Sequence, residues 1–112
     1  MKASCELAPE FRSRLLQVAD AVERDLGVSG SSMAIVVHGA RMIEGELRYD
    51  LSLASDDAPT LIRAMRDAFP RRKVGHLRAT IGKFGDLNLE NVALTDIEAA
   101  LARRADTRNP SR

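Results

Sequence analysis

The chain has 112 residues and a mass of 12.3 kDa, the size of one small domain. Apolar residues make up 45% and charged residues 29%, which excludes a disordered, collagen-like or disulfide-rich chain. The longest apolar run, Met33–Val37, is far shorter than the roughly 20 residues that cross a bilayer, and a single cysteine cannot form an internal disulfide. We therefore expect a cytoplasmic protein without a membrane-spanning segment or a secretory signal.

The first periodic segment predicts a helix from Pro9 to Leu26. Apolar side chains recur at helical spacing from Phe11 and Leu15 onward. Pro9 suits the first turn of a helix because a missing N–H costs nothing there, and Gly27 suits the left-handed residue that ends one.

Two strands are predicted next. Met33–Val37 is apolar on both faces, which predicts a buried central strand. Gly39 is predicted to form a tight connection into a second strand over residues 42–53, where apolar and polar residues alternate. Gly45 interrupts the apolar row and predicts a bulge in that strand. The row predicted to face solvent consists of Met42, Glu44, Glu46, Arg48, Asp50 and Ser52.

A second helix is predicted to begin after Asp56 and Asp57, whose side chains suit an N-cap, and to end at Pro70. A third strand is predicted over residues 74–84. After a turn, a short fourth strand is predicted at Leu87–Val92.

Thr95 and Glu98 have the spacing of a capping box, which predicts a last helix through about Arg104. The predicted order is α-β-β-α-β-β-α. The predicted fold is a single two-layer α+β domain with a mainly antiparallel sheet and its helices packed on one face. The predicted division is an N-terminal tail at 1–7, one domain at 8–104 and a flexible tail at 105–112.

Positive charge is concentrated in residues 61–85, where seven basic residues accompany one acidic residue. Such a segment can neutralise several phosphates, and it predicts a surface that binds nucleic acid or another anion. In the alternative interpretation, His76 and Arg78 face carboxylates of the second strand and stabilise the sheet. The candidate binding residues are Arg63, Arg66, Arg71, Arg72, Lys73 and Arg78.

The residue patterns do not indicate a catalytic centre. No metal-ligand spacing and no nucleophile elbow is present, so we predict no catalytic residue, no metal and no cofactor. A weaker hypothesis is a small enzyme with its site at a subunit interface and His38 or His76 as acid–base group.

The leading hypothesis is a small non-catalytic protein-interaction or regulatory module that self-associates. A sheet covered on one side leaves its other face open, and exposed strand edges can pair between two copies to give a dimer. The element order, with Gly27-Val-Ser-Gly30 before the first strand, is loosely similar to small profilin-like regulatory folds of the roadblock type. No functional residue is assigned from that similarity. The candidate contact residues are Met42, Glu44, Glu46, Arg48 and Phe84.

Overall fold

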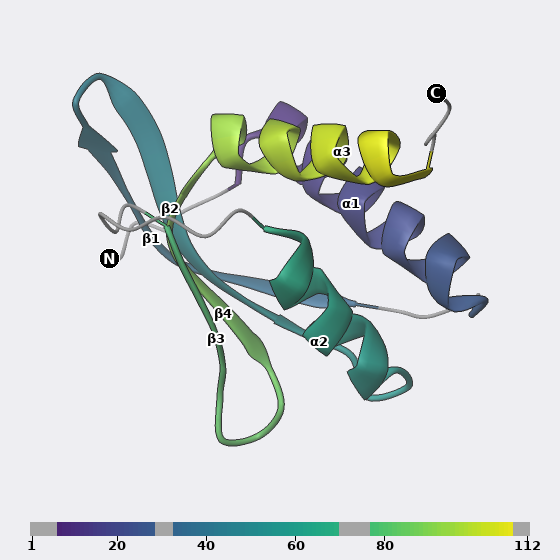
Figure 1. Cartoon of the computed structure of the whole chain (residues 1–112). Coiled ribbons are helices and arrows are strands. Elements are labelled where there is room, and N and C mark those ends of the chain that lie inside the picture. Colours follow the sequence, from purple (N-terminus) through teal and green to yellow (C-terminus); the bar gives the residue numbers. More distant parts are fainter. Residues whose placement is uncertain (1–6, 29–32, 70–76, 109–112) are drawn as a thin grey trace.

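The computed structural model of the chain describes residues 7–28, 33–69 and 77–108 (Figure 1). The elements are α1 (Pro9–Leu26), β1 (Ala34–Ile43), β2 (Glu46–Ala54), α2 (Pro59–Ala68), β3 (Arg78–Ile81), β4 (Leu87–Ala93) and α3 (Leu94–Arg108). The strands form one antiparallel sheet in the order β1-β2-β4-β3, and the helices pack on one of its faces (Figure 1). The predicted class and element order are confirmed.

The core lies between the helices and the sheet. Helix α1 has the predicted bounds, with Pro9 in its first turn and Gly27 in the left-handed region at φ 75°. Its Phe11 ring packs edge-on against Tyr49 of β2, with ring centroids 4.6 Å apart. The Tyr49 hydroxyl accepts a hydrogen bond from the backbone N–H of Ala8, the residue before α1, at 3.2 Å. This contact ties the start of α1 to the sheet.

The β1–β2 hairpin differs from the prediction. Its turn is at Glu44 and Gly45, which both have positive φ (53° and 79°), while Ile43 lies opposite Glu46. A two-residue turn of this kind matches the twist of the flanking strands, and a glycine adopts it without strain. The irregularity lies between Val37 and Gly39, where β1 bulges instead of turning. The predictions of a turn at Gly39 and a bulge at Gly45 are therefore wrong. The chain turns at Gly45, and the bulge adjoins Gly39.

This hairpin changes the predicted faces and the predicted position of the first strand. Strand β1 is an edge strand and not a central one, because β2 is its only neighbour among the described strands. Met42 lies opposite Leu47 and shares the face of Tyr49. It was predicted on the solvent-facing row because a single strand was expected over residues 42–53. Arg48 was predicted on that row too, but it is buried at 7% exposure.

The starts of the other two helices also correct the prediction. Neither Asp56 nor Asp57 caps α2; the Ser55 hydroxyl accepts the N–H of Ala58 at 3.2 Å instead. Helix α3 begins at Leu94, directly after β4, so Thr95 lies inside the helix and cannot cap it.

Asp96, in the first turn of α3, makes the reciprocal bond of a capping box, from the third helical residue back to the residue before the helix. Its carboxylate accepts the backbone N–H of Ala93 at 3.0 Å. The helix continues to Arg108, beyond the predicted end near residue 104. The predicted third strand is observed only at Arg78–Ile81, because Leu77 and residues 82–84 are not part of the strand. Residues 74–76 of that prediction lie outside the described part of the chain. No helix in the described part has the length and apolar character that a membrane crossing requires.

Candidate interaction surface

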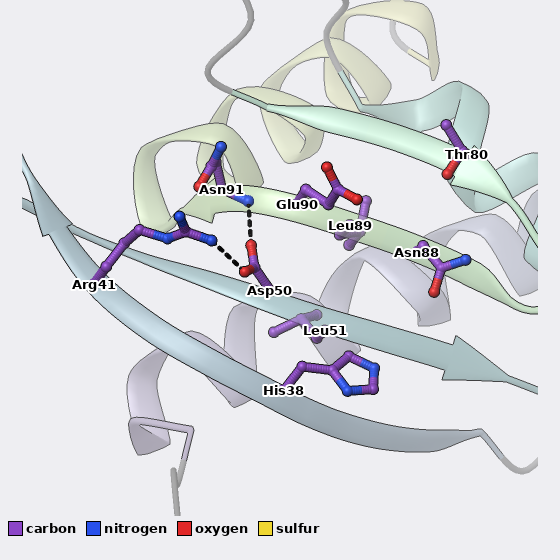
Figure 2. A pocket seen from close by; sticks show the side chains of 9 residues that line it. All are labelled: His38, Arg41, Asp50, Leu51, Thr80, Asn88, Leu89, Glu90 and Asn91. Atoms are coloured by element: carbon purple, nitrogen blue, oxygen red, sulfur yellow. Dashed lines mark hydrogen bonds and ion pairs between the residues drawn. The ribbon is translucent and has the colours of Figure 1, made fainter.

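Asp50 occupies the centre of the sheet face that the helices leave uncovered, which we call the open face (Figure 2). Both neighbouring strands are irregular beside it. Strand β1 shifts register between Val37 and Gly39, and β4 places Glu90 and Asn91 between the partners of Tyr49 and Leu51. The Asp50 carboxylate accepts the backbone N–H of Asn91 at 2.9 Å and forms an ion pair with Arg41. Asp50 therefore links its two neighbouring strands, β1 and β4, close to their irregularities.

The two irregularities border a hollow of about 520 Å³ on the open face, which we call the sheet hollow. Its polar side chains come from all four strands and lie on the same side of the sheet (Figure 2). The polar lining residues are His38, Arg41, Asp50, Thr80, Asn88, Glu90 and Asn91.

A short chain of hydrogen bonds crosses the sheet beside this hollow. His38 Nε2 lies 2.8 Å from Ser52 Oγ, and the Ser52 hydroxyl donates to Asn88 Oδ1 at 2.7 Å. The direction of the His38–Ser52 hydrogen bond depends on which imidazole nitrogen carries the proton. The enzyme hypothesis stays a prediction. His76 lies outside the described residues.

Two of the predicted contact residues take part in internal contacts. Arg48 donates to the Asn91 backbone carbonyl at 2.6 Å and to Glu46 at 2.8 Å. It also lies 3.3 Å from the carboxylate of Asp96. Glu46 accepts the hydroxyl of Thr95 at 2.6 Å. These contacts join β2 to the start of α3 and leave little of Arg48 for a partner.

The other three predicted contact residues are exposed but lie on two different hairpins. Met42 and Glu44 lie at the tip of the β1–β2 hairpin, whereas Phe84 lies in the loop between β3 and β4. The two hairpins project in different directions (Figure 1). The five predicted contact residues therefore do not form one surface.

The described basic residues are divided between two sides of the sheet. Arg78 lies opposite Glu90 in the sheet register, on the open face. Arg63 and Arg66 are on α2, which packs on the covered face, and Arg66 donates to Asp67 at 3.1 Å. Arg71, Arg72 and Lys73 lie outside the described residues. Binding of nucleic acid stays a prediction.

The sequence predicts the first strand in the middle of the sheet, whereas β1 lies at its edge. Residues 33–40 contain neither a charged residue nor a proline. Val36 is on the open face, opposite Ser52, and is 52% exposed. The other edge strand, β3, has four residues and begins with the charged Arg78. The lack of charge over residues 33–40 was the available signal, and it was interpreted as burial in the middle of the sheet.

Comparisons with protein-family models, curated proteins and solved structures find no match to this chain. Within the described residues, no three His, Cys, Asp or Glu side chains are grouped to hold a metal ion.

Proposed function

We propose that this protein is a small interaction module that self-associates through the outer edge of β1. One observation carries the proposal: a strand at the edge of the sheet has the composition of an interior strand. Edge strands in natural proteins are usually protected by charged residues, prolines, bulges or covering segments, because an unpaired edge is a template for another strand. Residues 33–40 have neither charge nor proline.

The regular part of β1 supports pairing with another strand. Ala34, Ile35, Val36 and Val37 follow one continuous register with β2 before the irregularity at His38. A regular segment of this length can add backbone hydrogen bonds on its outer side. The bulge that follows restricts this pairing to the first half of the strand.

A charge placed on this edge tests the proposal. Val36 is half exposed, so Val36→Lys is compatible with the folded monomer, but in a dimer it brings two like charges to neighbouring strands. The matched control is Thr80→Lys, an exposed position on the open face of the opposite edge strand. Light scattering after size-exclusion chromatography measures the mass of each variant, and circular dichroism checks that each is folded.

We expect a dimer for the unmodified chain and for Thr80→Lys, and a folded monomer for Val36→Lys. A folded Val36→Lys variant with the same dimeric mass would show that the β1 edge is not the contact. If only Thr80→Lys produced a monomer, the dimer contact would lie at the β3 edge instead.

A further inference from the structure

We infer that two copies of the chain pair antiparallel along β1 with Val36 opposite Val36 of the partner subunit. This inference rests on the proposed function and specifies its geometry. The product is one continuous eight-stranded sheet, with β1 and its counterpart at the centre.

The faces of β1 restrict the registers that two copies can adopt. Ile35 and Val37 are half-buried and pack against the core, whereas Ala34 and Val36 are exposed on the other side. Directly opposed residues of an antiparallel pair share a face. A two-fold axis between Ile35 and Val36 would place an open-face residue opposite a covered-face residue, so the axis must pass through a residue position.

Side-chain pairing distinguishes among the remaining registers. With the axis at Val36, two valines meet on the open face, and Ile35 lies opposite Val37 of the partner subunit twice on the covered face. β-Branched side chains at opposed positions are the pairs that stabilise a sheet. With the axis at Val37, Ile35 would instead meet the partner's Gly39, which has no side chain. With the axis at Ile35, Val36 would meet the partner's Ala34. The register centred on Val36 alone pairs all three β-branched residues with one another.

Charge and the helix layer are compatible with this arrangement. Residues 33–40 bring no like charges together across the axis. Within the described residues, the helices pack mainly against β2, β3 and β4, and no helix covers the outer side of β1. An axis perpendicular to the sheet keeps the two helix layers on one face. The two sheet hollows, which include His38 and Arg41 of β1, then open on the other face.

Distances between nitroxide labels test the register. Single cysteines replace Ala34, Val36 or His38 in a Cys5→Ser chain, so that each variant carries one label on the open face. In an antiparallel pair related by a two-fold axis, a residue and its copy are shifted along the strand by twice the number of residues that separate each from the axis. Each residue of shift adds about 3.4 Å. Thr80→Cys on the opposite edge is the control, and light scattering confirms the mass of each labelled protein.

We expect the shortest distance at position 36 and nearly equal, longer distances at 34 and 38, with an added offset of about 14 Å along the strand. Equal distances at 34 and 36 would place the axis at Ile35, and equal distances at 36 and 38 would place it at Val37; either result overturns the inference. If the label at position 36 prevents dimer formation, equal label-to-label distances at positions 34 and 38 still place the axis at Val36. A dimer with a short distance only at position 80 would overturn the inference, whereas a monomeric unlabelled chain would overturn the proposed function itself.

Discussion

The guanidinium of Arg48 lies 3.3 Å from the carboxylate of Asp96, with the two side chains 9% and 1% exposed. The pair connects β2 to the first turn of α3. Arg48 also donates to the Asn91 carbonyl, and Asp96 also accepts the Ala93 N–H. The same two side chains therefore satisfy the backbone at the point where β4 ends and α3 begins. A buried ion pair of this kind is costly to break because the remaining partner stays buried.

We expect Asp96→Ala to lower the free energy of unfolding by about 3 kcal/mol, because Arg48 would keep a buried charge with Glu46 as its one remaining carboxylate partner among the described residues. Urea denaturation measures the loss. Arg41→Ala is the control, because Arg41 and Asp50 form an ion pair with side chains 52% and 27% exposed. Breaking that pair should cost less than about 1 kcal/mol. Equal losses in the two variants would contradict the structural role of the buried pair.

The turn at Glu44 and Gly45 makes a second prediction. Gly45→Ala places a side chain at φ 79° and should cost about 1 kcal/mol of stability. Glu44→Asn should stabilise the hairpin by a few tenths of a kcal/mol, roughly, because asparagine tolerates positive φ better than glutamate does. Urea denaturation of both variants measures these effects. If Gly45→Ala had no effect and Gly39→Ala were destabilising, the turn would be at Gly39 after all.

The hydroxyl of Tyr49 provides a third prediction. Tyr49→Phe keeps the ring contact with Phe11 but leaves the Ala8 N–H without its hydroxyl acceptor. We expect a loss of about 1 kcal/mol in the free energy of unfolding. Hydrogen exchange at the first turn of α1 should rise in the same variant. Unchanged stability and exchange would show that this hydrogen bond does not hold α1 to the sheet.

The basic segment yields a fourth prediction, which separates the two function hypotheses. The described members Arg63 and Arg78 lie on different sides of the sheet, so we expect no tight binding to short single- or double-stranded nucleic acids. Fluorescence anisotropy at about 50 and 200 mM salt measures it, because phosphate contacts weaken steeply over that range. Micromolar or tighter binding that falls with salt, and that Arg71→Glu with Arg72→Glu abolishes, would favour the nucleic-acid hypothesis.

The sequence alone predicts the elements that are determined by local residue patterns. Helix α1 has its predicted bounds because its apolar stripe, its Pro9 and its Gly27 all indicate the same helix. The order of the elements is confirmed for the same reason. Such features depend on neighbours within a few residues, and one chain displays them directly.

The position of the strands in the sheet could not be predicted in this way. The pattern over residues 42–53 alternates as one strand would, although Glu44 and Gly45 turn the chain within it. Which of two glycines turns and which bulges depends on cross-strand pairing, and so does the burial of Arg48 against Asp96. The sheet hollow was missed for the same reason, because Asp50 and Asn91 meet only across strands.

Sedimentation equilibrium of the unmodified chain over a range of micromolar concentrations measures self-association without any substitution or label. We expect a dimer with about twice the chain mass of 12.3 kDa that dissociates on dilution. A chain that sediments as a folded monomer at every concentration would contradict self-association through β1.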